Sequence, residues 1–220
     1  MRFSFTRLLL CLVIGAGIGT LLAQFHVQMD SIYMFIGLFA VIFLAFYGYT
    51  YYRLYNTKDL KWVDKYIRDN LNNPYYAYLH HYVEGDLSRA EESIRKLKPG
   101  LKNDLIRDLG LIAIYMETKR YEEARRLSEQ LSVPDARHYS LGLIALVHKD
   151  WDEYAFHREQ LKDKRFRQIF ETEEAFHRGD LKKAKETADR LLAQSGGITR
   201  YLLVKGIERS ENDPDRTFYF

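Results

Sequence analysis

The chain has 220 residues and a formal net charge of +3, so it lacks the concentrated basic charge typical of nucleic-acid-binding proteins. Its single cysteine, Cys11, excludes a disulfide framework and a thiol cluster for zinc. Only four prolines interrupt long stretches in which apolar residues recur with helical spacing, and this pattern predicts an all-α fold.

Two uncharged runs open the chain, residues 8–29 and residues 31–52, separated only by Asp30. At about 1.5 Å per residue each run reaches roughly 33 Å as a helix, enough to cross a hydrocarbon core of about 30 Å. We predict that residues 1–52 form a transmembrane helical hairpin. The alternative is that the first run is a secretory signal, although no A-x-A-like cleavage site follows it. The second run then still anchors the chain.

Positive residues lie on the outer flanks of the hairpin, with Arg2 and Arg7 before it and Arg53, Lys58 and Lys61 after it. Short cytoplasmic flanks are enriched in Lys and Arg, so we expect a two-pass protein of a bacterial-type inner (cytoplasmic) membrane with both termini cytoplasmic. Tyrosines gather at the cytoplasmic end of the second run and predict an interfacial aromatic belt. These are Tyr47, Tyr49, Tyr51, Tyr52 and Tyr55.

Small residues form one face of the first run, where Gly15 and Gly19 are spaced for close helix approach. This face packs on the second helix or forms the seam of a homodimer, and the sequence leaves both open. Neither run carries an ionisable residue in its interior, which argues against a transporter or a channel.

Residues 53–74 are expected to form a juxtamembrane amphipathic helix. Leu60, Val63, Ile67 and Leu71 lie on one helical stripe, and the helix should end before Pro74. An aromatic group at the start of the repeat domain either packs this helix on the first unit or lines a recognition groove near the bilayer. Its members are Trp62, Tyr66, Tyr75, Tyr76, Tyr78, His80, His81 and Tyr82.

A repeat occupies residues 75–209. Second helices are predicted to begin at Leu87, Tyr121, Trp151 and Leu181, at spacings of 34, 30 and 30 residues. Two further columns stay in phase, Ala90, Ala124, Tyr154 and Ala184, and Leu97, Leu131, Leu161 and Leu191. Gly85 and Gly179 suit a left-handed helix end, and Asp86, Asp150 and Asp180 are placed to cap the next helix. We therefore predict about four helix–turn–helix units that stack as an α-solenoid.

This pattern resembles the tetratricopeptide repeat. The match includes Leu141-Gly142 and Trp151 of the third unit, the small residues Ala90, Ala124 and Ala184, and Pro99 and Pro134 near unit ends. It departs from the family where Tyr154 replaces a small residue, where the first-helix Trp is missing and where two spacings are short. The resemblance implies stacked hairpins in a right-handed superhelix, with a concave surface that binds a peptide or helix.

The chain ends in a predicted capping helix, residues 198–209, and a polar and aromatic tail, residues 210–220. We expect the tip, Phe218, Tyr219 and Phe220, to fold back onto the stack; the alternative is recognition by another protein.

Candidate chemistry is sparse. His80 and His81 diverge by about 100° on a helix and cannot easily share a metal ion. Glu174 and His177 form one carboxylate–imidazole pair where a di-iron bundle needs two. No nucleophile elbow, phosphate loop or dinucleotide fingerprint is present in the sequence. We expect no enzyme activity, no cofactor and no metal site.

The predicted function is a membrane-anchored scaffold or adaptor that binds a membrane-associated protein, or its cytoplasmic tail, on the concave surface. The candidate binding residues, chosen because they fall in first helices, are Tyr78, Tyr82, Arg107, Leu111, Tyr115, His138, Tyr139 and Arg167. Two alternatives stay open. One is a membrane enzyme or its regulatory subunit, using His80, His81, Glu174 and His177. The other is a self-associating structural protein that uses Gly15 and Gly19.

Overall fold

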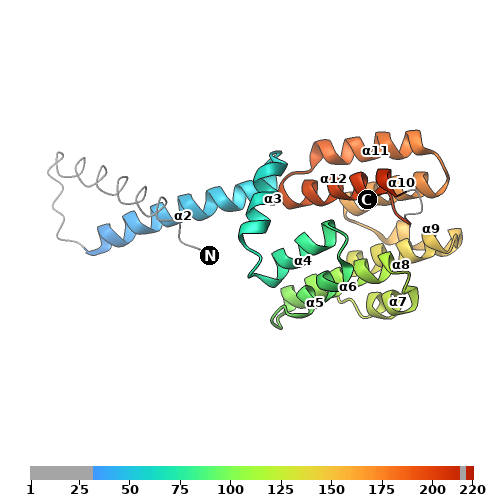
Figure 1. Cartoon of the computed structure of the whole chain (residues 1–220), viewed down its shortest axis with the longest axis horizontal. Helices are drawn as coiled ribbons and strands as arrows, with labels where there is room; N and C mark the ends of the chain where they lie inside the picture. The colour runs from blue at the N-terminus through green and yellow to red at the C-terminus, as the bar shows by residue number, and fades with distance from the viewer. Residues whose placement is uncertain (1–31, 214–216) are drawn as a thin grey trace. The chain divides into compact units, whose positions relative to one another are not determined.

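The computed structural model describes residues 32–213 and 217–220, and every element in these ranges is an α-helix (Figure 1). The chain divides into two compact units, residues 1–54 and 55–220. The all-α prediction is confirmed for the described residues.

Helix α2, Ile32–Asn56, covers most of the second uncharged run. In the ranges described, no helix combines the length and hydropathy needed to cross a membrane. The described side chains of α2 include five exposed tyrosines in its second half. The structure therefore does not support the predicted transmembrane hairpin. The first run, with Gly15 and Gly19, lies outside the described residues.

Four helical hairpins follow in the second unit. They are α4 (Pro74–Val83) with α5 (Leu87–Arg95), α6 (Leu101–Glu117) with α7 (Tyr121–Glu129), α8 (Pro134–Val147) with α9 (Trp151–Gln160), and α10 (Lys164–His177) with α11 (Leu181–Gln194). The second helices begin at the four predicted residues. Three begin with the predicted caps, because the carboxylates of Asp86, Asp150 and Asp180 accept main-chain N–H groups three residues on at 3.0–3.1 Å.

The four turns share one backbone conformation. Gly85 and Gly179 have φ of 81° and 77°, and Lys119 and Lys149, at the equivalent positions, both have φ of 58°. The next residue donates its N–H across the helix end in each turn, as from Asp86 to the carbonyl of His81 at 2.9 Å and from Arg120 to that of Tyr115 at 2.7 Å. The left-handed end therefore tolerates lysine where glycine is easiest.

The predicted core columns are buried except at Leu97, which is half-buried. Ala90, Ala124 and Ala184 are fully buried, and Tyr154 is 2% exposed in the third unit. The Tyr154 ring lies 5.2 Å from that of Phe170, and its hydroxyl donates to the Phe170 carbonyl at 3.3 Å. Tyr154 thus reaches from α9 to the following hairpin, which a small residue cannot do.

Two further helices join the ends of the stack. Helix α3, Leu60–Asp69, buries Val63 and Ile67 as predicted, although it is shorter than residues 53–74. Leu71, predicted on the same stripe, lies beyond its end and is exposed. Helix α12, Gly197–Asn212, was expected to cap the far end of an open stack, but it packs on α3 and α4 as well as α11. The Tyr201 hydroxyl donates to Asp64 at 2.8 Å, and the Gly197 N–H donates to the Thr57 carbonyl at 2.7 Å.

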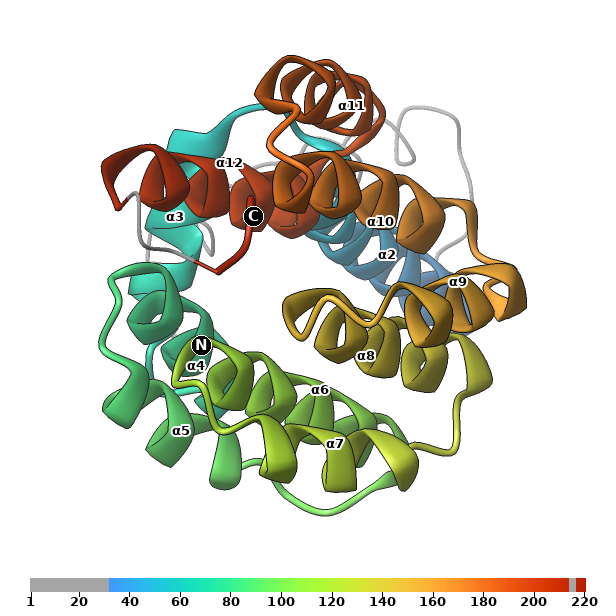
Figure 2. The same ribbon diagram turned by 90° about the vertical axis from the view of Figure 1, so that its right-hand side faces the viewer.

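The second unit is therefore a closed ring and not an open superhelix. Figure 2 shows α4, α6, α8, α10 and α12 around a central space in which the C-terminus lies. The aromatic group closes the α3–α4 joint, with the rings of Tyr66 and Tyr76 edge to face at 5.5 Å. Tyr66 and Tyr76 therefore pack the joint, as the first interpretation predicted, whereas Tyr82 of the same group lines the cavity described below.

Candidate functional site: a groove at the centre of the ring

A cavity of about 250 Å³ lies on the inner side of the hairpins. Most of its lining is apolar and comes from first helices and the tail. The lining residues are Tyr82, Leu109, Ile112, Ala113, Met116, Glu117, Tyr139, Ser140, Leu143, Phe166, Glu173, Phe218 and Phe220. The chain's own tail forms part of this lining, beside the first helices of the hairpins.

The tail docks through its main chain on one carboxylate. Glu173 of α10 is 2% exposed, and its Oε2 accepts the N–H of Tyr219 at 2.9 Å while its Oε1 accepts the N–H of Phe220 at 3.2 Å. Hydrogen bonds to an ionised acceptor are roughly twice as strong as neutral ones. Two consecutive N–H groups on one buried carboxylate fix the position of the segment.

Ring contacts hold the tail on both sides of this carboxylate. Phe218 is 7% exposed, with its ring 6.3 Å from that of His177, and Tyr219 meets Phe176 at 5.8 Å. Burial lowers the pKa of His177, so the imidazole beside Phe218 is held in its neutral form at pH 7. The predicted fold-back of the aromatic tip is confirmed.

Helix α12 approaches the tail at Gly206, a position that has no side chain. A Cβ on Gly206 would lie 2.7 Å from the Cα of Phe220, which is closer than real atoms come. Glycine is therefore required here so that the two backbones can pass each other.

A polar cluster closes the groove on its α4 side. Arg209 of α12 pairs with Glu117 of α6 at 3.1 Å and donates to the Tyr82 carbonyl at 3.0 Å. The Tyr82 hydroxyl donates to the same carboxylate at 3.2 Å, and the Arg209 guanidinium lies 5.2 Å from the Tyr82 ring centre. This cluster, which we call the clasp, links three helices of the ring.

The predicted binding residues separate into several places. Tyr82 and Tyr139 line the groove, and Tyr78 is buried beside Tyr82 with its ring 5.6 Å away. Leu111 and Tyr115 line a second, open depression together with residues of α5 and α7.

The remaining three predicted residues have partners of their own. Arg107 pairs with Asp104 and Asp108, His138 contacts His157 at 3.0 Å between the two Nδ1 atoms, and Arg167 donates to the Leu161 carbonyl at 2.6 Å. The structure therefore does not gather the eight residues into one surface.

Sequence reasoning missed Glu173 and Phe166 as groove residues. A signal was available, because Phe166, Phe170 and Glu173 lie at helical spacing on one stripe of α10 that is otherwise apolar. One carboxylate in such a stripe marks a buried charge that needs donors.

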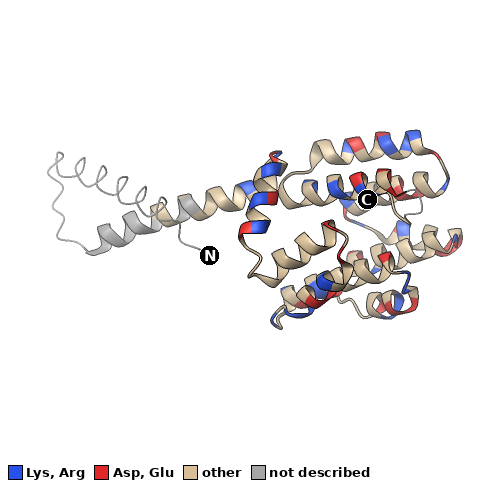
Figure 3. Cartoon of the chain, viewed as in Figure 1, with Lys and Arg blue, Asp and Glu red and all other residues tan. Residues whose placement is uncertain are grey.

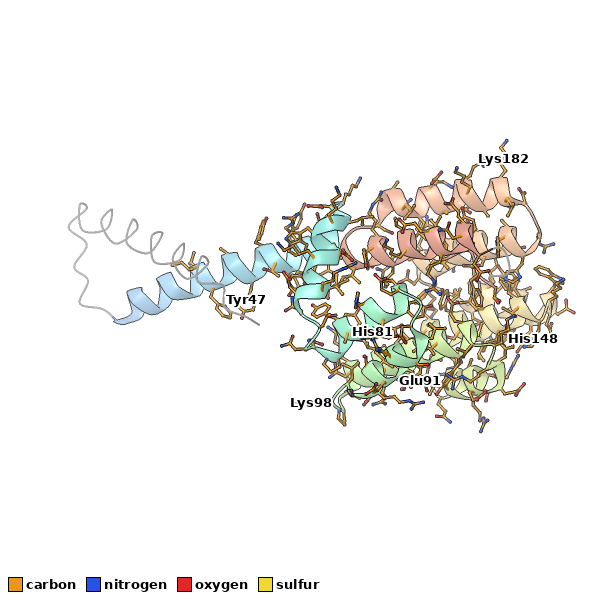
Figure 4. All side chains as sticks on the ribbon, viewed as in Figure 1. Tyr47, His81, Glu91, Lys98, His148 and Lys182 are labelled. Atoms are coloured by element: carbon orange, nitrogen blue, oxygen red, sulfur yellow. The ribbon has the colours of Figure 1, made fainter. Side chains whose placement is uncertain are left out.

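The residues proposed for an enzyme do not assemble. Glu174 pairs with Arg158 and Arg178 and accepts the Tyr154 hydroxyl, while His177 faces the tail. Within residues 32–213 and 217–220, no three metal-ligating side chains come together. His81 and Glu91, labelled in Figure 4, belong to the first hairpin and not to the groove lining.

Charge on the second unit is mixed. Lys, Arg, Asp and Glu alternate over its helices without a region of one sign (Figure 3). No family model, no curated protein and no solved structure matches the chain.

Proposed function

We propose that the protein is a membrane-anchored adaptor of the tetratricopeptide-like class, which binds a protein partner in the groove at the centre of its ring. One observation carries this proposal: a non-helical aromatic segment, residues 217–220, already occupies the groove through specific hydrogen bonds and ring contacts. A surface that holds its own segment in this way has the chemistry to hold another.

The sequence supports the anchor, through the uncharged residues 8–29 and 31–52 with positive flanks. The exposed tyrosines of α2, among them Tyr49, Tyr51 and Tyr52, suit an interfacial belt. Tethering raises the effective concentration of the groove toward other membrane proteins. After alkaline carbonate washing, the full chain should stay with the membranes; recovery in the wash would end the anchor proposal.

Photo-crosslinking in cells tests partner binding. A photoreactive amino acid at Tyr139, inside the groove, should capture one recurrent membrane protein, whose identity would also show whether an enzyme is being regulated. The same amino acid at Tyr115, in a first helix but in the other depression, is the matched control. The adaptor proposal fails if both sites capture the same proteins, or if Tyr139 captures none even when the tail is made unable to dock.

A further inference from the structure

We infer that residues 217–220 are an internal substitute for the partner, and that the partner presents a short non-helical segment with the same chemistry. This segment carries an aromatic side chain at the place of Phe218, followed by two main-chain N–H groups for Glu173. The inference rests on the proposed function and names the partner's chemical class.

The requirement for two main-chain donors follows from the surroundings of Glu173. Its carboxylate is 2% exposed at a cavity lined mainly by apolar side chains, where losing hydrogen bonds to a buried polar group is costly. The tail supplies two donors, at 2.9 and 3.2 Å. A competing segment must replace both, so proline is excluded at the positions of Tyr219 and Phe220 because it has no N–H.

The requirement for an aromatic residue follows from the ring contacts. Phe218 lies 6.3 Å from the neutral imidazole of His177, and the next ring lies 5.8 Å from that of Phe176. Aromatic pairs at such distances contribute beyond the area that they bury. Helix α12 also approaches closely at Gly206, where an added Cβ would lie 2.7 Å from the Cα of Phe220, so the segment must bring its backbone close to α12 at this place.

The tail competes from a high local concentration. It follows α12, which ends at Asn212, by only a few residues, and a short connection holds a ligand at an effective concentration on the order of mM. A partner must displace the tail. The partner's apparent affinity equals its intrinsic affinity multiplied by the fraction of molecules in which the tail is undocked. Weakening the tail should therefore strengthen partner binding.

A labelled peptide tests this directly. The probe is SENDPDRTFYF, residues 210–220 of this chain, added to the full chain in detergent. The receptor carries Phe218→Asp and Tyr219→Pro, so that its own tail cannot dock, and its thermal unfolding verifies that it is folded. We expect it to bind the peptide at least about 10-fold more tightly than the wild-type chain does.

Two matched changes isolate the chemistry. N-methylation of the peptide at Tyr219 removes one donor to Glu173 and should weaken binding about 10-fold, since hydrogen bonds to charged groups are the strong ones. N-methylation at Asn212, outside the docked segment, should have no effect. Glu173→Gln in the receptor should also weaken binding about 10-fold. The inference would be overturned if the two methylated peptides bound equally. It would also be overturned if the receptor bound the peptide equally with and without Glu173→Gln.

The outcomes for the two proposals are separable. If the peptide binds as described but Tyr139 captures no protein in cells, the groove chemistry stands and the adaptor function fails. If Tyr139 captures a partner but the peptide does not bind, the adaptor stands and this inference fails. A wild-type dimer held by exchanged tails, detected by light scattering, would also overturn it, because the groove would then serve a second copy.

Discussion

Lysine takes the place of glycine in two of four equivalent turns, at Lys119 and Lys149. A left-handed conformation costs an L-residue roughly 1–2 kcal/mol, so the chain already bears this cost twice. Gly179 has the same conformation without that cost, at φ of 77°. Equivalent helix ends therefore differ in backbone strain from one hairpin to the next.

We expect Gly179→Ala to lower the free energy of unfolding by about 1 kcal/mol, because alanine takes on the left-handed strain. Lys149→Ala should change it by less than about 0.5 kcal/mol, since the strain is already present. Urea unfolding of the two variants provides the measurement. Equal losses of unfolding free energy in the two variants would show that left-handed strain does not determine the effect of alanine at this turn.

Two histidines, the buried His157 and the half-buried His177, have lowered pKa values that favour the neutral imidazole. Burial lowers the pKa of His157, and the nearby His138 and Arg125 lower it further, while Glu153 opposes them. Burial also lowers the pKa of His177. The unfolded chain then binds more protons than the folded chain between the lowered pKa values and about 6.5.

The contribution of these histidines to the free energy of unfolding is therefore complete above about pH 6.5, and it declines as the pH falls below that value. Free energies of unfolding measured between pH 5 and pH 8 should show this slope. His157→Gln should reduce the slope, because glutamine does not titrate. A variant that keeps the full slope would assign it to other groups.

At the scale of elements, the contact between α8 and α10 depends on a missing side chain. A Cβ on Gly142 would lie 2.5 Å from the Cζ of Phe170, whose ring also lies near those of Tyr139 and Tyr154. Phe170 is fully buried, so it has no free direction in which to move.

Gly142→Ala should lower the free energy of unfolding by about 1–3 kcal/mol, the usual cost of overpacking. Phe170→Leu replaces the clashing ring by a shorter side chain. The double variant should therefore lose less free energy of unfolding than the sum of the two single losses. A double-mutant cycle in urea measures this coupling. Additive losses would mean that the two helices separate freely.

Local patterns made the hairpins predictable. Helix starts at Leu87 and Leu181 follow from an aspartate cap after a glycine, which are signals within three residues. The groove was harder, since Tyr115 and Tyr139 both lie in first helices but face different depressions. Successive helical residues turn by about 100°, so membership of a helix does not tell which side a residue faces.

At the scale of the whole second unit, closure of the ring was not predictable from the sequence. It depends on contacts such as Tyr201 with Asp64, which are separated by 137 residues. The periodicity of the sequence does not indicate such a pairing. An amphipathic helix at the end of a repeat array is therefore interpreted as the cap of an open stack. The tail's partner, Glu173, also lies far from it in sequence.

The clasp gives a test of closure. Arg209→Ala removes the cation beside Glu117, whose side chain is 10% exposed, and should lower the free energy of unfolding by about 2–3 kcal/mol. The double variant Arg209→Leu with Glu117→Leu should lose less, because it removes the carboxylate together with its cation. Hydrogen exchange at the Tyr219 amide should quicken in the single variant. An unchanged exchange rate would separate the clasp from the tail.

Closure also constrains how such a chain can change its length. An open stack of repeats gains a unit by duplication, since each unit contacts only its neighbours and a new one extends the end. Here the last helix, α12, must reach α3, so a fifth hairpin would separate Tyr201 from Asp64 and open the ring. Closure therefore ties the number of hairpins to the contact between α12 and α3.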